Sequence, residues 1–393
     1  MRKFVLLLLA VITITTASAQ EISNKGTDFW VGYGYHQVMS PTTGNNGQNM
    51  VIYIATDLPS IVTVSIPGVG YSQTYNIAAG TIFTTPPMPK TGPQDCRLNT
   101  SGLLDRGIHI TSDNPIVAYA HIYNSSVSGA CVLLPTNTLG KEYYSINYTN
   151  NSNTADANCW FYVVATEPGT TDVEITPSAP AIGHPANVPF TVSLQQGQIY
   201  NVMGEVSGNF GQDLTGSVVR SLAGGGSCKR IGVFSGSGRI YINCGSGNTS
   251  SDNYMVQAFP KAAWGKKYLT APTAGSMGRN IYRVCVSDKL AVVKINGVVT
   301  SLPLINNFYY EIPITGAPQL IESDLPITVA QYITTQGTCG NGSPGDPEVI
   351  YLSPVEQNIK DVLFNSNLLV NNSPPAHQHW VHAIIPNGGT ALS

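Results

Sequence analysis

Three histidines near the end of the chain form its densest group of potential metal ligands. His377 and His379 would share one face of a strand, and His382 follows closely. Neutral imidazoles suit zinc, nickel or copper. However, zinc sites need three or four convergent ligands, and no Cys, Asp or Glu lies close by. Because Asn372-Ser373-Pro374-Pro375 precedes the group, the favoured interpretation is an exposed linker. The sequence predicts no metal or other cofactor.

Two aspartates occupy matching positions and raise the question of a calcium loop. Asp252 and Asp346 each stand eight residues before a proline, Pro260 and Pro354, and Val127 holds the same position before Pro135. Oxygen-rich loops bind calcium. An aspartate that caps a turn through nearby backbone amides is the favoured alternative.

No grouping in the sequence predicts catalysis. A hydrolase requires a nucleophile on a strained turn, supported by a histidine and a carboxylate. Gly236-Ser237-Gly238 lies in a predicted hairpin turn instead, and His36, His109 and His121 have no repeated acidic neighbour. A glycosidase needs two converging carboxylates, which sequence alone cannot place. We therefore predict no catalytic residue and no enzyme.

Seven cysteines in an exported chain suggest disulfides, and the odd number leaves at least one thiol without an internal partner. Cys228 and Cys244 lie at equal distances from Gly236, so two hairpin strands would bring them face to face. The sequence predicts a Cys228–Cys244 disulfide, provided that the hairpin forms. The partners of the other five cysteines stay open.

Large aromatic residues gather near the start of the mature chain and at later junctions. Large aromatics fill the cores between sheets, so core packing is the favoured role, and a sugar- or peptide-stacking surface is the alternative. The residues concerned are Phe29, Trp30, Tyr33, Tyr35, Trp160 and Trp264.

Charge is scarce in this chain. It is 42% hydrophobic and only 10% charged, against a usual charged share of roughly a quarter. Uncharged polar residues must therefore cover the surface, which is common in exported β-rich proteins and argues against a nucleic-acid partner. The net charge of -3 gives no basis for electrostatic steering.

The first residues are typical of a cleaved secretion signal. Met1-Arg2-Lys3 is basic, residues 4–12 are apolar, and Ala17-Ser18-Ala19 is a small-residue cleavage site. The apolar run is too short for a membrane span, and no later segment is long enough. We predict a secreted or cell-surface protein that begins near Gln20.

One stretch of the sequence returns further along the chain and divides it into similar segments. Residues 112–120, SDNPIVAYA, return as residues 323–331, SDLPITVAQ, with a weaker copy at residues 230–236. Prolines 135, 260 and 354 close the copies, and Gly140 and Gly265 each stand five residues after such a proline. We predict β units at 20–139, 140–264 and 265–357 after a signal peptide at 1–19. An incomplete fourth unit at 358–393 suggests that the sequence is part of a longer protein, and the alternative is a last strand that closes the fold.

Alternating apolar residues in each segment predict half-buried strands. The matching pairs are Val64 and Ile66, Val173 and Ile175, and Val293 and Ile295. Only residues 358–364 could form a short helix. The predicted fold class is all-β, with tandem β-sandwich-like repeat units of about 115 residues; a propeller-like ring of the same repeats is the alternative.

Several segments together resemble the N-terminal domain of IgG Fc-binding proteins, over nearly all of the mature chain. They are residues 26–32, 112–119, 213–217, 256–265 and 346–348. The sequence looks most similar to versions in large exported proteins of Bacteroidetes-type bacteria, which continue into adhesion modules. The resemblance implies a secreted recognition domain, and the family name implies immunoglobulin binding, but no binding residue carries over.

The sequence thus predicts a non-enzymatic binding or adhesion module of a larger secreted or cell-surface protein. The expected ligand is a host or matrix glycoprotein, mucin-like or immunoglobulin-like. Two alternatives remain, a structural spacer and a carbohydrate-active enzyme, and the latter requires two carboxylates within about 5–10 Å in a cleft.

Overall fold

The computed structural model describes residues 24–224, 228–274, 278–342 and 345–357, together with residues 363, 381, 383 and 385. The chain is almost entirely β, with curved, half-barrel-like sheets, which confirms the predicted all-β class. Within the described part the helices are short 3-10 turns, and none could cross a membrane. The signal peptide, the three C-terminal histidines and nearly all of residues 358–393 lie outside the described residues.

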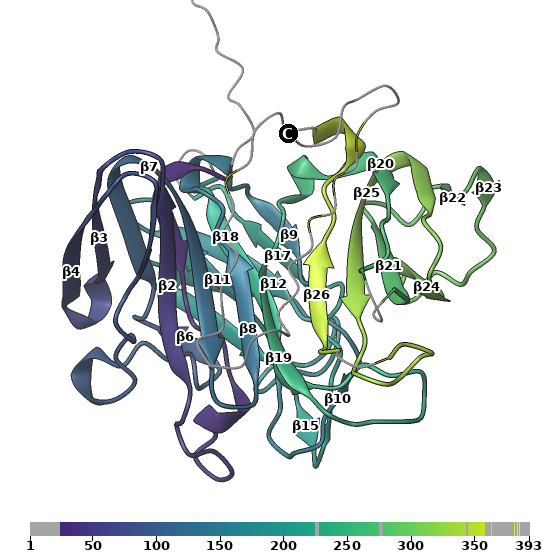
Figure 1. Cartoon of the computed structure of the whole chain (residues 1–393), viewed down its shortest axis with the longest axis horizontal. Helices are drawn as coiled ribbons and strands as arrows, with labels where there is room; N and C mark the ends of the chain where they lie inside the picture. The colour runs from purple at the N-terminus through teal and green to yellow at the C-terminus, as the bar shows by residue number, and fades with distance from the viewer. Residues whose placement is uncertain are drawn as a thin grey trace, which may run out of the picture.

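The first sheet contains seven strands, and the long strand β7 lies at its centre (Figure 1). Its members are β1 (Gly26–Val31), β2 (Asn49–Thr56), β3 (Ser60–Ile66), β4 (Tyr71–Ile77), β5 (Thr81–Thr84), β7 (Ile108–Tyr123) and β8 (Ser128–Val132). Short 3-10 turns follow at η1 (Gln37–Met39), η2 (Pro67–Val69), η3 (Gly92–Gln94) and η4 (Thr136–Thr138). The remaining strand, β6 (Gly102–Leu104), pairs with β14 of the next segment.

The middle of the chain forms two larger sheets and one small sheet. One sheet has β9 (Glu142–Tyr144), β12 (Thr171–Thr176), β13 (Phe190–Leu194) and β17 (Val218–Ser221). The second has β11 (Cys159–Ala165), β14 (Ile199–Met203), β18 (Ile231–Ile240) and β19 (Asp252–Gln257), together with β6. The small sheet has β10 (Asn150–Asn151), β15 (Val206–Ser207) and β16 (Phe210–Gly211), and η5 (Lys261–Ala263) ends the segment.

The last sheet again contains seven strands around one long strand, β25. Its members are β20 (Gly265–Leu269), β21 (Asn280–Val286), β22 (Val293–Ile295), β23 (Val298–Val299), β24 (Tyr309–Thr315), β25 (Leu320–Ile333) and β26 (Glu348–Tyr351), followed by η7 (Val355–Gln357).

The long strands β7 and β25 each serve two sets of partners. The first part of β7 pairs with β1 and β3, and its second part pairs with β2 and β8. Likewise, the first part of β25 pairs with β20 and β22, and its second part pairs with β21 and β26. Each long strand changes partners at the repeated Ser-Asp-x-Pro sequence. There Asp113 and Asp324 accept the backbone amides of Ile61 and Val292 at 2.8 and 2.7 Å.

In the middle segment two strands share this role. Strand β17 pairs with β9 and β12, and β18 pairs with β11 and β19. The pairing is therefore equivalent in all three segments. The repeat of about 115 residues itself stays a prediction from the sequence.

The opening glycine of each segment packs against the closing proline of the same segment. A Cβ on Gly26 or Gly140 would lie 2.4 Å from the Cβ of Pro135 or Pro260, and one on Gly265 would lie 2.2 Å from that of Pro354. Any side chain would thus force the two ends of a segment apart.

The predicted strand alternation is confirmed by burial. Val64, Ile66, Val173 and Ile175 are fully buried, and Val293 is 1% exposed. Apolar clusters extend across the boundaries between segments: Trp160 and Phe234 of the middle segment join the core of the first sheet. The three segments therefore pack into one body.

The predicted hairpin at residues 236–238 is wrong, and with it the Cys228–Cys244 disulfide. Strand β18 runs without a turn from Ile231 to Ile240. Its glycines allow close packing instead, since a Cβ on Gly236 would lie 2.4 Å from the ring of Trp160. Cys244 is bonded to Cys339, and Cys228 is a free, partly exposed cysteine.

Candidate binding cleft

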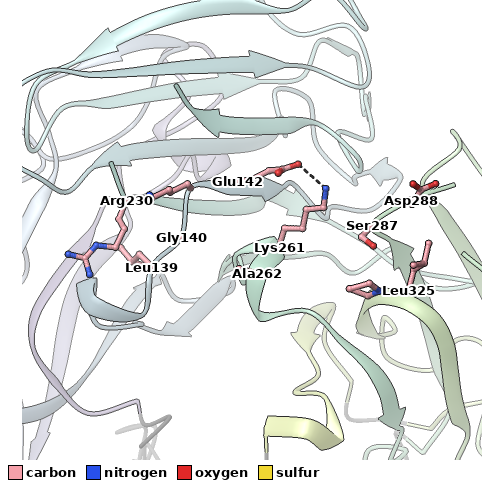
Figure 2. Close-up of a pocket in the computed structure, with 11 residues that line it drawn as sticks. Leu139, Gly140, Glu142, Arg230, Lys261, Ala262, Ser287, Asp288 and Leu325 are labelled. Carbon is pink, nitrogen blue, oxygen red and sulfur yellow. Dashed lines mark hydrogen bonds and ion pairs between the residues drawn. The ribbon is translucent and has the colours of Figure 1, made fainter. Parts of the chain in front are cut away.

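A cleft of about 750 Å³ opens between the middle segment and the last segment (Figure 2). Five regions of the chain line it: the entry into β9, the residue before β18, the turn η5, the turn after β21, and part of β25. The lining residues are Leu139, Gly140, Lys141, Glu142, Arg230, Lys261, Ala262, Ser287, Asp288, Leu325 and Pro326.

Charged side chains are concentrated in this cleft, although charge is scarce in the chain. The Lys261 ammonium lies 3.1 Å from the Glu142 carboxylate and 5.6 Å from the ring centroid of Tyr144. Burial lowers the pKa of Lys261, but its hydrogen bonds and charge interactions with Glu142 and Tyr144 together outweigh this effect and raise the pKa overall. Lys261 therefore stays charged.

Two further cations lie at one end of the cleft. The Arg230 side chain pairs with Glu167 at 2.7 Å and remains 41% exposed, so part of its guanidinium is open to a ligand. Lys141 is exposed. At the other end Asp288 is exposed, and its carboxylate accepts the backbone amide of Leu290 at 2.9 Å.

Backbone hydrogen bonds and packing hold the cleft in shape. The Tyr143 hydroxyl accepts the amide of Gly140 at 2.7 Å, and Gly140 lies against Pro260. These contacts fix the loops that carry Lys141 and Lys261, so their charges are positioned before a ligand arrives. A fixed, open surface with cations at one end and an acid at the other is suited to polar recognition of a partner.

The structure brings the carboxyls of Asp252 and Asp346 into contact through a hydrogen bond. Burial and the neighbouring Asp346 raise the pKa of Asp252 to about 8, and burial also raises that of Asp346. Asp252 accepts the backbone amides of Ser128 and, at 2.8 Å, Asn253. Asp252 therefore accepts these backbone amides from a position within strand β19 and does not cap a turn. Among the described residues no group of three or more His, Cys, Asp or Glu could hold a metal ion.

The histidines of the described part have structural contacts. His109 stacks on Trp30 with centroids 4.0 Å apart and lies 2.7 Å from the Asp28 carboxylate. His121 hydrogen-bonds the Tyr53 and Ser128 hydroxyls at 3.0 and 2.9 Å. Burial lowers its pKa to about 4, so it is neutral at physiological pH.

The aromatic residues singled out in the sequence are core residues. Their exposures range from 0% for Phe29 and Tyr33 to 8% for Trp264. Trp160 donates its indole N–H to the Tyr35 carbonyl at 2.8 Å across the first and middle segments. Core packing is therefore the correct interpretation, and these residues form no surface for stacking sugars.

Sequence reasoning missed the residues that line the cleft, because they come from five regions far apart in the chain. It also missed Arg283, which is 1% exposed and pairs with Asp213 and Glu311 at 2.7 and 2.9 Å. The scarcity of charge was the available signal, since each charged group in such a chain needs a particular reason.

The curved sheets and the polar cleft between two segments define an all-β domain with an open cleft. The family described as IgGFc binding protein matches residues 129–387, and the chain belongs to this family. The match begins within β8, so most of the first sheet precedes it. No curated protein matches the chain, and no solved structure does either.

Proposed function

We propose that this chain is a non-enzymatic recognition module of an exported protein and that it binds a host or matrix glycoprotein, mucin-like or immunoglobulin-like. The observation that carries the proposal is the charged, open cleft of Figure 2, in a chain with only 10% charged residues. Membership in a family of binding proteins supports it. The Cys244–Cys339 disulfide fits the oxidising compartment of an exported protein.

The cleft and its surroundings favour binding over the two alternatives. A spacer needs no concave surface between its segments, whereas this cleft is built jointly by the middle and last segments. For a carbohydrate-active enzyme, Asp252 and Asp346 would be one candidate pair of carboxyls. These carboxyls share a hydrogen bond, which is closer than the separation of about 5–10 Å that a glycosidic bond between two carboxylates requires.

A binding assay with charge-reversal variants tests this proposal. The full chain is passed over immobilised immunoglobulin G and over immobilised mucin. We expect binding to at least one surface, and we expect Lys141→Glu to weaken it by about tenfold or more, since a hydrogen bond to a charged group contributes about 1.5–3 kcal/mol. Lys294→Glu makes the same charge change on β22, outside the cleft, and should leave binding unchanged. No binding to either surface, or equal losses in both variants, would contradict the proposal.

A further inference from the structure

A second cavity lies where the three segments meet. Strands β8, β19 and β26 lie side by side in the middle of the molecule (Figure 1). Each pairs along one edge only, with β7, β18 and β25 respectively. Residues of all three strands surround a cavity of about 240 Å³. The cavity is separate from the cleft, with which it shares no lining residue.

One wall of the cavity carries a buried hydrogen-bond donor without an acceptor. Gln257 is 5% exposed, and its side-chain Oε1 accepts the backbone amide of Leu134 at 2.7 Å. Its Nε2 has no hydrogen-bond partner in the described structure. Leaving such a donor unsatisfied costs about 1–3 kcal/mol. A ligand that brings an acceptor to Nε2 would remove this cost.

A carboxyl group lines the same cavity. Glu348 accepts the backbone amide of Val349 at 2.8 Å, and burial raises its pKa well above the usual range. A neutral carboxyl can both donate and accept a hydrogen bond. Among the described residues that line the cavity none is cationic, and Asp252 and Asp346 interact with Glu348. The surroundings therefore favour an uncharged ligand.

The other walls are apolar and aromatic. Val132 and Ile350 are each 39% exposed, and Val256 is 9% exposed. The rings of Phe259 and Tyr351 meet edge to face, with centroids 5.9 Å apart. The Tyr351 hydroxyl is held by Ser235 at 2.9 Å, so this ring has a fixed orientation. Aromatic walls beside a few polar groups are typical of small-molecule sites.

We propose that this cavity binds the acetamido group of an N-acetylated hexosamine. The acetyl oxygen accepts from Gln257 Nε2, the amide N–H donates to Glu348, and the methyl group contacts Val132 and Ile350. The sugar ring lies against Phe259 and Tyr351. The volume is smaller than the range of roughly 300–1,000 Å³ for drug-sized ligands, so one sugar unit fills it. An acetylated lysine offers the same amide without a ring, and the aromatic pair favours the sugar.

Free sugars test the site without any glycoprotein, so the outcome of this test is independent of the proposed function. Calorimetric titration of the whole chain with N-acetylglucosamine and N-acetylgalactosamine should give saturable binding to at least one of them. Glucosamine and glucose should bind about tenfold more weakly or not at all, because they leave Gln257 Nε2 unpaired. Equal affinity for glucose, tighter binding of N-acetyl-lysine, or no binding of either acetylated sugar would overturn the proposal.

Two variants locate the binding. Gln257→Met keeps the length of the side chain and removes the donor, so it should reduce affinity for the acetylated sugar by about tenfold. Gln94→Met makes the same change on an exposed turn and should bind normally. Should Gln257→Met fail to fold because the Leu134 amide loses its acceptor, Val132→Trp at the exposed mouth blocks the cavity from outside and should abolish binding in a folded chain. Normal binding by folded Gln257→Met or by Val132→Trp would contradict the site.

Discussion

At the scale of single residues, the buried Arg283 shows how few charges this chain uses and where it uses them. Its guanidinium lies 4.4 Å from the ring centroids of both Tyr148 and Tyr309, and it bridges Asp213 of the middle segment and Glu311 of the last segment. The Asp213 to Ser217 segment, which carries part of the family resemblance, therefore has a structural role at this junction.

Removing this side chain should destabilise the whole molecule. Breaking a buried ion pair costs about 3–5 kcal/mol because the partner charges lose their compensation. We expect Arg283→Ala to lower the free energy of unfolding by that amount in urea titrations. Arg220, 48% exposed and 3.6 Å from Glu174, provides the control, since Arg220→Ala should cost about 1 kcal/mol or less. Similar costs for both variants would show that Arg283 does not hold the junction.

Asp252 predicts a pH dependence of stability. Its pKa is about 8 in the folded state, against an ordinary 3.8, so the folded chain keeps a proton that the unfolded chain loses. The resulting stabilisation is complete below about pH 4 and is lost as the pH rises to about 8. Asp252→Asn should reduce this decline in urea titrations over that range without abolishing it, because the pKa values of Asp346 and Glu348 are raised too. The exposed Asp288→Asn should leave the decline unchanged. An unchanged decline in Asp252→Asn would refute this assignment.

At the scale of elements, the sequence predicted which residues form strands, but it did not predict which strands pair. Alternating valines and isoleucines identified β3, β12 and β22 because burial on one face imposes a period of two. The Gly-Ser-Gly sequence in β18 misled because glycine serves both turns and close packing, and only the position of Trp160 distinguishes the two. The disulfide prediction depended on the hairpin and failed with it.

The Cys244–Cys339 disulfide joins elements that are 95 residues apart. Closing a loop of this length restricts the unfolded chain, and losing such a bond typically costs about 2–5 kcal/mol. We expect reductant to lower the urea midpoint of the natural chain and to have no further effect on the Cys244→Ala, Cys339→Ala double variant. Peptide mapping should recover the 244–339 linkage. A 228–244 linkage would contradict the structure.

At the scale of the whole molecule, three equivalently paired sets of strands meet through β8, β19 and β26. The sequence predicted three units from two Ser-Asp-x-Pro stretches and the closing prolines, and the bounds of those units stay a prediction. It could not indicate the cleft or the central cavity. The cleft depends on how Lys141, Lys261 and Asp288 approach one another from separate turns, and the cavity depends on how β8, β19 and β26 meet. Packing between segments decides both.

The most direct test of this account is hydrogen exchange on the full chain, with and without the proposed ligand, immunoglobulin G or mucin. The account predicts slower exchange at the rim of the cleft, in residues 139–142, 261–262, 287–288 and 325–326, with little change in the exposed hairpin of β22 and β23. Slower exchange confined to that hairpin or to the outer strands of the first sheet would contradict the central claim that the junction between segments is the recognition surface.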